Sequence, residues 1–114
     1  MEYLDKVANF APRTETNDVI RISSEVDRIY QNTRGRVEIL DQRLGRKITV
    51  EKEGSSSTVV WNPWMSKSQQ MPDFGNEEYE RMVCVESGNV ALNSIKLAPG
   101  QTSTLKVKLS SQLL

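Results

Sequence analysis

Histidine is absent from this chain of 114 residues, and Cys84 is the single cysteine. Without histidine, these residues cannot form a Ser–His or Cys–His catalytic pair. A zinc site would have to use carboxylates alone, which is not how protein zinc sites are built, so we predict no metal. One cysteine forms no intrachain disulfide, and a reducing compartment such as the cytoplasm is the simplest expectation.

Long apolar runs and an excess of either charge are also missing. No stretch approaches the roughly 18 apolar residues of a membrane-spanning helix, and the opening MEYLDKVANF lacks the apolar core of a secretory signal. Lysine and arginine total 15, as do aspartate and glutamate. This balance gives no electrostatic reason to expect nucleic acid or a membrane as a partner. The length allows one small domain, 1–114, without an internal boundary.

Strand-like alternation is what the chain does contain. It predicts antiparallel strands over most of residues 19–61 and 81–110, with at most short helical turns between 65 and 80. A five-residue connection at 41–45 includes Gly45, which can adopt positive φ in a hairpin. The predicted class is all-β, an antiparallel sheet or β-sandwich. Individual strands are expected at 19–22, 26–30, 37–40, 47–51, 58–61, 81–86 and 103–110.

Glu86 is the first candidate for chemistry. Side chains alternate along MVCVE, so Met82, Cys84 and Glu86 share one face of the expected strand and the valines share the other. The carboxylate would end an apolar strand and be partly desolvated, an environment that makes a carboxylate more basic. The same pattern also fits a solvated glutamate at a strand end. Cys84 lies between valines, which favours a buried small hydrophobe over a reactive thiol.

Asp27 is the second candidate. Aspartate is disfavoured within strands, yet Asp27 lies inside the strand-like segment SSEVDRIY. Alternation puts it on the face of Glu25 and Ile29, with Val26 and Tyr30 on the other face. A ligand-binding carboxylate fits this position, and so does an aspartate that bonds the backbone at a bulge or neighbours Arg28 on the surface.

The segment WNPW is the third candidate. Trp61 and Trp64 flank an Asn-Pro pair, and the proline restricts Asn62 to extended geometry. An aromatic platform beside an amide suits a sugar ring and its hydroxyl groups. It suits core packing at the edge of a sandwich equally well, because buried tryptophan is commonly used in that way.

Taken together, these segments resemble a known signature. VVWNPW is followed by a lysine, by MPDF, by a tyrosine and by MVCVESG. This order is similar to that of the hexose-6-phosphate mutarotases in the aldose 1-epimerase superfamily. SEVDRIY resembles their substrate-binding strand, LAPG their closing turn, and YLDKV the sequence before that strand. The resemblance extends from Tyr3 to Leu109.

The resemblance implies a glucose-6-phosphate 1-epimerase, an isomerase that interconverts the anomers of hexose 6-phosphates without a cofactor. Family members are longer and fold as a β-supersandwich of the galactose-mutarotase type, so this chain would be its C-terminal part. Glu86 matches the catalytic glutamate, which acts as the general base. Asp27 matches the aspartate that binds the substrate. The family's acid histidine and its phosphate-gripping arginines would lie upstream of the residues present.

Two other interpretations remain open at this point. The chain is a catalytically incomplete fragment, inactive alone because the acid histidine is absent, or it is a carbohydrate-binding β-sandwich remnant. The register around Glu86 argues against a binding module without enzymatic ancestry, which would not need a carboxylate there. A sandwich cut partway would also leave open sheet edges and exposed apolar faces, so self-association is expected.

Overall fold

Eight strands and four short helical segments make up the chain in the computed structural model, which describes all 114 residues. The strands are β1 (Glu2–Asp5), β2 (Ala11–Thr14), β3 (Val26–Gln31), β4 (Val37–Asp41), β5 (Arg46–Glu53), β6 (Ser57–Asn62), β7 (Cys84–Gly88) and β8 (Lys106–Leu113). The helical segments are η1 (Lys6–Ala8), α1 (Trp64–Gln70), η2 (Glu78–Arg81) and η3 (Ala91–Asn93).

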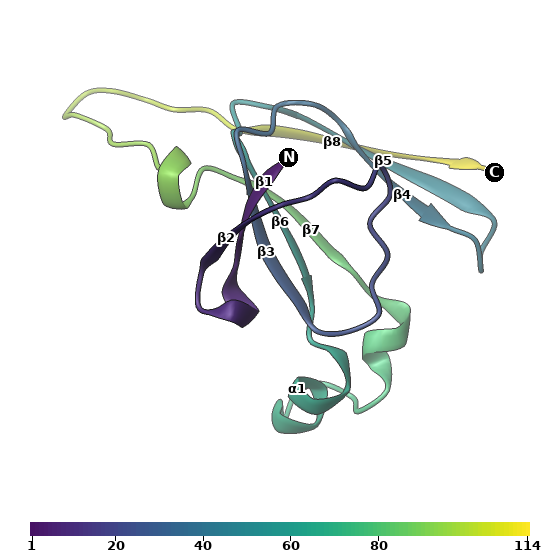
Figure 1. Cartoon of the computed structure of the whole chain (residues 1–114). Coiled ribbons are helices and arrows are strands. Elements are labelled where there is room, and N and C mark those ends of the chain that lie inside the picture. The colour runs from purple at the N-terminus through teal and green to yellow at the C-terminus, as the bar shows by residue number, and fades with distance from the viewer.

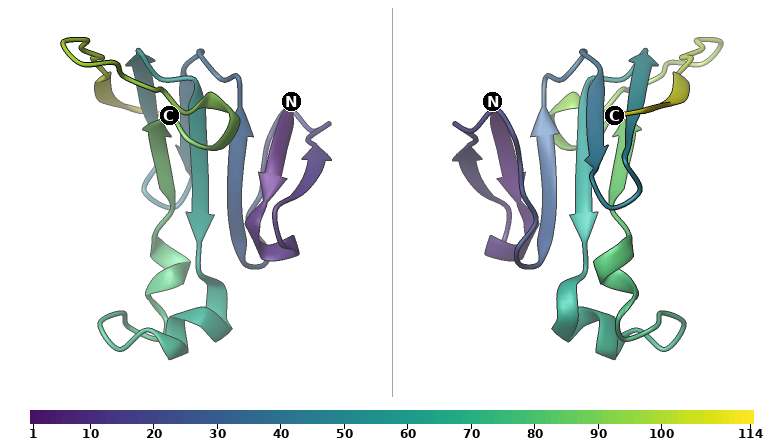
Figure 2. Two further views of the ribbon diagram at one scale, coloured as in Figure 1. Left: turned by 90° about the vertical axis from the view of Figure 1, so that its left-hand side faces the viewer. Right: turned by 90° about the vertical axis from the view of Figure 1, so that its right-hand side faces the viewer.

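The strands form two sheets in which every neighbouring pair is antiparallel. The large sheet has the order β2-β1-β3-β6-β7, and the small sheet has the order β4-β5-β8 (Figure 1). Figure 2 shows the large sheet with its strands side by side and with α1 and η2 beyond one end of it. The all-β antiparallel class that the sequence predicts is confirmed.

Most expected strands form, and four details differ. Residues 19–22 are not a strand, because β1 takes the free edge of β3 to which they could have paired. The short strands β1 and β2 were not predicted. The last two strands lie about three residues further along than expected, at 84–88 and 106–113, since η2 extends to Arg81 and pairing with β5 sets the position of β8. The hairpin connection has four residues, 42–45, and Gly45 has φ +61° as expected.

The core lies on one face of the large sheet. Its buried members are Tyr3, Val26, Tyr30 and Val60, against which Ile22 and Val83 pack. The rings of Tyr3 and Tyr30 are 5.1 Å apart between centroids. The alternation predicted for Val26 and Tyr30 is therefore confirmed, because the strand directs both side chains to the same face.

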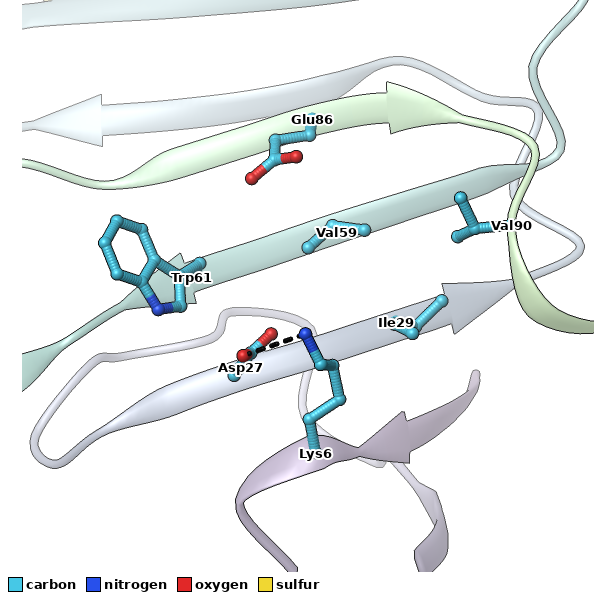
Figure 3. Close-up of a pocket in the computed structure, with 7 residues that line it drawn as sticks. All are labelled: Lys6, Asp27, Ile29, Val59, Trp61, Glu86 and Val90. Atoms are coloured by element: carbon cyan, nitrogen blue, oxygen red, sulfur yellow. Dashed lines mark ion pairs between the residues drawn. The ribbon is translucent and has the colours of Figure 1, made fainter. Parts of the chain in front are cut away.

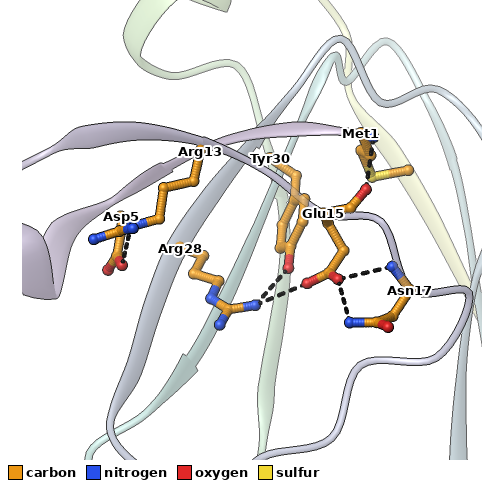
Figure 4. Close-up of polar contacts among 7 residues, drawn as sticks. All are labelled: Met1, Asp5, Arg13, Glu15, Asn17, Arg28 and Tyr30. Atoms are coloured by element: carbon orange, nitrogen blue, oxygen red, sulfur yellow. Dashed lines mark hydrogen bonds and ion pairs between the residues drawn. The ribbon is translucent and has the colours of Figure 1, made fainter.

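A polar network borders this core (Figure 4). Arg28 lies over the Tyr3 ring, with its guanidinium carbon 4.7 Å from the ring centroid. The same guanidinium donates hydrogen bonds to the Tyr30 hydroxyl and the Glu15 carboxylate, each at 3.2 Å. Glu15 also accepts hydrogen bonds from the backbone and side chain of Asn17. These hydrogen bonds hold Glu15 and Asn17, which follow β2, against the edge of the core.

Lys52 joins the small sheet to the large one. Its ammonium donates hydrogen bonds to the Thr33 and Thr58 hydroxyls at 3.0 and 2.9 Å, to the Ser55 hydroxyl at 3.1 Å and to the Ser57 carbonyl at 2.9 Å. Burial lowers the pKa of Lys52 below its ordinary value. A partly buried ammonium is costly unless its donors are bonded, and these four acceptors satisfy them at the junction between the sheets.

The interior is small, and one apolar face is uncovered. Only 14 of the 114 residues are buried, and the radius of gyration of 15.5 Å exceeds the roughly 13 Å of a compact domain of this size. Strand β8 pairs with β5 alone. Val107, Leu109 and Leu113 lie on its apolar face and are 45%, 69% and 84% exposed. The free edge and the apolar side chains beside it form a surface suited to pairing with another chain.

We propose that this surface makes the chain associate with itself. Leu109→Lys places a charge on the uncovered face and should shift the chain towards the 12.9 kDa monomer, whereas the wild type should show a mass that rises with concentration in sedimentation equilibrium. Ser110→Lys is the matched control, because residue 110 lies on the same strand and faces the other side. A wild type that sediments as a monomer at every concentration would contradict the proposal.

Candidate functional site

An open pocket of about 360 Å³ lies on the face of the large sheet opposite the core (Figure 3). Because successive side chains of a strand point to opposite faces, the same strands that supply the core also supply this pocket from their alternate residues. Its lining consists of Lys6, Asp27, Ile29, Val59, Trp61, Glu86 and Val90.

The strand register brings the two predicted site carboxylates into this pocket. Asp27 of β3 pairs with Trp61 of β6, and Val59 of β6 pairs with Glu86 of β7. Since β6 lies between β3 and β7, the backbones of Asp27 and Glu86 are two strand spacings apart, about 10 Å across the sheet. They are also offset along the strands by the two residues from Val59 to Trp61. Figure 3 shows them on the same side of the sheet, with Val59 and Trp61 between them. A ligand lying over β6 could contact both.

Asp27 is held by an ion pair that the sequence did not indicate. Its carboxylate is 13% exposed and lies 3.2 Å from the Lys6 ammonium. Strand β1 pairs with β3 so that Asp5 opposes Arg28, and continuing this register brings Lys6 beside Asp27. No local pattern around Lys6 signals this contact, because it depends on the pairing of two strands more than 20 residues apart in the sequence.

The turn that carries Lys6 is itself fixed. Asp5 caps η1, and its Oδ1 accepts a hydrogen bond from the Val7 amide at 3.2 Å. The other oxygen of Asp5 accepts from Arg13 Nε at 3.1 Å, a contact that Figure 4 also shows. Asn9 then ends η1 in the left-handed conformation, with φ 55°. Lys6 therefore extends towards the pocket from a capped turn.

Glu86 is exposed, so of the two alternatives that the pattern left open, a partly desolvated carboxylate and a solvated one at a strand end, the structure has the solvated one. The physical reason is its place in the fold: β7 is the edge strand of the large sheet, so no further strand shields it. The Glu86 carboxylate makes no hydrogen bond or ion pair, and Figure 3 shows it extending over the pocket. Its oxygens are free to accept a proton or a hydrogen bond from a ligand.

Cys84 shares the Glu86 face of β7, as the alternation predicts. It is opposite Trp61 in the strand register and is partly buried. Burial raises the pKa of the Cys84 thiol, and the nearby Glu86 carboxylate raises that pKa further. A raised pKa lowers the thiolate fraction at neutral pH, which agrees with the expectation that Cys84 is not a reactive thiol.

The two tryptophans of WNPW have different roles. Trp61 lines the pocket, whereas Trp64 begins α1 and packs on Tyr79 with ring centroids 5.0 Å apart. The buried Asn62 amide donates to the carbonyls of Tyr79 and Met82, each at 2.9 Å, and its oxygen accepts from the Trp64 amide. Asn62 therefore anchors the segment after β6 and is not available to a sugar, so for this residue the structure has the packing alternative that the sequence had left open.

No group of three or more His, Cys, Asp or Glu side chains is placed to hold a metal ion. No helix of the chain is both long enough and apolar enough to cross a membrane.

The two antiparallel sheets and the acidic pocket fit the β-sandwich fold of one family. The family model described as aldose 1-epimerase matches residues 2–110. The chain therefore belongs to the aldose 1-epimerase family.

Curated relatives carry the name "Putative glucose-6-phosphate 1-epimerase". The chain is 39% identical to the one from Cenchrus ciliaris over 111 residues, which cover 97% of the chain and 33% of that relative. It is 35% identical to the one from Haemophilus influenzae over 69 residues, covering 60% of the chain and 24% of the relative. The Escherichia coli relative is 31% identical over 85 residues, which cover 75% of the chain and 29% of that relative. The chain thus spans about a third or less of these relatives.

The pKa of the Cys84 thiol reports whether the Glu86 carboxylate lies near it. Glu86→Gln should lower the pKa of Cys84 part of the way towards its ordinary value, since the carboxylate is the smaller of the two causes and burial remains. The alkylation rate at a fixed mildly alkaline pH should rise accordingly. Asp27→Asn is the control, because that carboxylate lies two strands away and should leave the rate unchanged. An alkylation profile that is identical in the wild type and Glu86→Gln would show that the carboxylate is not near the thiol.

Proposed function

We propose that this pocket is the base-bearing part of a glucose 6-phosphate 1-epimerase site, which interconverts the α and β anomers of hexose 6-phosphates. The observation that carries the proposal is the placement of Glu86 and Asp27 on one face of three paired strands, with Trp61 between them. The name that these relatives carry, putative glucose-6-phosphate 1-epimerase, supports the choice of substrate.

Glu86 is the proposed general base. Anomer exchange requires a base that takes the proton of the C1 hydroxyl while an acid protonates the ring oxygen. The ring then opens, the C1–C2 bond rotates and the ring closes on the other face. A base must be able to reach the proton that it removes, and the exposed, unpaired Glu86 carboxylate meets that condition. A single general base typically contributes about 10²–10⁴-fold to the rate.

Asp27 is the proposed receptor for sugar hydroxyls. A carboxylate accepts hydrogen bonds and, when ionised, donates none. Its ion pair with Lys6 at 3.2 Å fixes it on the pocket floor, and it is less exposed than Glu86. The Trp61 ring beside it offers an apolar surface for the C–H face of a pyranose. Together, Asp27 and Trp61 would orient the ring so that C1 faces Glu86.

The acid is the component that these residues do not supply. The 114 residues contain no histidine, and the Asp27 carboxylate is already engaged in the ion pair with Lys6. The same observations favour a second candidate function, in which the chain is a catalytically incomplete part of the family fold that at most binds sugar weakly. On the epimerase proposal, the group that protonates the ring oxygen would have to come from outside these residues.

The isolated chain should not accelerate anomer exchange. Freshly dissolved α-glucose 6-phosphate should approach equilibrium at the buffer rate with or without the chain, as followed by polarimetry. In an active relative that has a glutamate aligned with Glu86, replacing that glutamate by glutamine should reduce activity at least about a hundredfold, because the base is lost while the volume is kept. If the chain alone speeds the exchange and Glu86→Gln abolishes that effect, these residues contain a complete catalyst and the proposed division is wrong.

In an active relative that has an aspartate aligned with Asp27, that aspartate should govern substrate recognition. Its replacement by asparagine keeps the shape and removes the charge from its hydrogen bonds, which are worth about 1.5–3 kcal/mol each. We expect kcat/KM to fall about ten- to a hundredfold with an unchanged melting temperature. Unchanged kinetics together with unchanged stability would assign Asp27 a purely structural role.

A further inference from the structure

A buried amide lies on the pocket face of the large sheet without a hydrogen-bonding partner. Gln31 is the last residue of β3 and is 6% exposed. Neither its side-chain nitrogen nor its side-chain oxygen forms a hydrogen bond. Because side chains alternate along a strand, Gln31 lies on the same face as Asp27 and Ile29, which line the pocket. A buried polar group without a partner is costly, so this arrangement destabilises the fold.

The strand register places Gln31 and Asp27 on opposite sides of Glu86. Glu86 pairs with Val59, and Val59 pairs with Ile29, so these three residues form one row across the sheet. Asp27 is two residues from this row in one direction along β3, and Gln31 is two residues from it in the other direction. Each step of two residues along a strand is about 7 Å. A ligand centred over Val59 therefore lies between the two polar groups.

The segment that follows β7 covers the Gln31 end of the pocket. Val90 lines the pocket (Figure 3), and its amide donates a hydrogen bond to the hydroxyl of Ser57, the residue that pairs with Gln31. The same hydroxyl donates to the Val90 carbonyl at 3.3 Å, which is long for an O–H···O bond. Ala91 has φ 50°, a left-handed conformation that is unfavourable for a residue with a β-carbon. Displacement of this segment would relieve Ala91 and open a path from the pocket to the amide.

The chemistry of an amide suits a sugar hydroxyl. A glutamine side chain both donates and accepts hydrogen bonds, as a hydroxyl group does, whereas ionised carboxylates such as Asp27 and Glu86 only accept. A sugar hydroxyl that donates to a carboxylate still has lone pairs, to which an amide nitrogen can donate. Gln31 therefore has the donor capacity that the two carboxylates lack.

We propose that Gln31 is a further substrate-binding residue of this pocket, whose amide binds a hydroxyl group of the sugar when residues 90–93 move aside. The proposal rests on the proposed function and adds to it a polar contact on the side of the base opposite Asp27. The unpartnered amide then lowers the stability of the free chain and strengthens the binding of the sugar. An amide that had no ligand would have the first effect alone.

Replacing Gln31 by methionine removes the amide and keeps the length of the side chain. In the whole chain, we expect Gln31→Met to raise the melting temperature by a few degrees, because an unpartnered buried polar group is removed. The Kd for glucose 6-phosphate, measured by NMR, should rise about two- to tenfold, the effect of one uncharged hydrogen bond. Gln31→Leu should behave in the same way. In the wild type, the sugar should also shift the side-chain amide resonances of Gln31. Gln70→Met is the matched control, because Gln70 is exposed on α1, and it should change neither property.

The contrary results are distinct. If either Gln31 variant binds glucose 6-phosphate as tightly as the wild type, the proposed role of Gln31 is wrong and the sugar site remains. Unshifted Gln31 resonances in a wild type that binds the sugar would have the same meaning. A variant that loses stability together with affinity would show that the amide already has a partner within the fold, which also overturns the role. If the sugar shifts no resonance of Asp27, Trp61 or Glu86 in the wild type, the proposed function itself is wrong and the role of Gln31 falls with it.

Discussion

The antiparallel pairing of β3 with β6 is the constraint on which both faces of the large sheet depend. The pairing runs from Val26 opposite Asn62 to Gln31 opposite Ser57. Because a strand alternates its side chains, this one register sends Val26, Tyr30 and Val60 into the core and Asp27 and Trp61 into the pocket. A slip of one residue would exchange the two faces and bury the carboxylate among tyrosines. The packing of the core therefore keeps the pocket carboxylate in position.

The third strand of the site is fixed by a polar clamp at its far end. The Ser55 hydroxyl donates to the Gly88 carbonyl at 2.8 Å, and Asn89 bonds the Gly54 carbonyl and the Ser56 amide. These contacts hold the chain immediately after Glu86 against the β5–β6 turn. The Ser55 hydroxyl, which lies in this turn, also accepts a hydrogen bond from the Lys52 ammonium. One hydroxyl group therefore contacts both the junction between the sheets and the end of β7. The serines that read as a simple turn in the sequence thus connect the small sheet to the site.

Glu86 and the apolar side chains of β8 are exposed for the same reason, because each lies on an edge strand. Strand β7 has a partner on one side only, which leaves Glu86 exposed, and β8 likewise ends the small sheet with apolar side chains in solvent. A ligand can therefore reach the Glu86 carboxylate from solvent.

The sequence by itself determined the all-β class, the faces of Asp27 and Glu86, and the absence of a histidine acid, because these follow from local alternation and composition. It did not determine β1 and β2, because segments of four residues carry too little pattern. It also predicted a strand at 19–22 that does not form, because β1 occupies the edge of β3 to which that segment could have paired. Only the tertiary structure decided that Asp27 and Glu86 share a pocket and that Lys6 pairs with Asp27. It also decided that the Asn62 side chain forms its hydrogen bonds with backbone groups. Each of these depends on which strands become neighbours, and that choice is made by the packing of side chains distant in sequence, which no local pattern records.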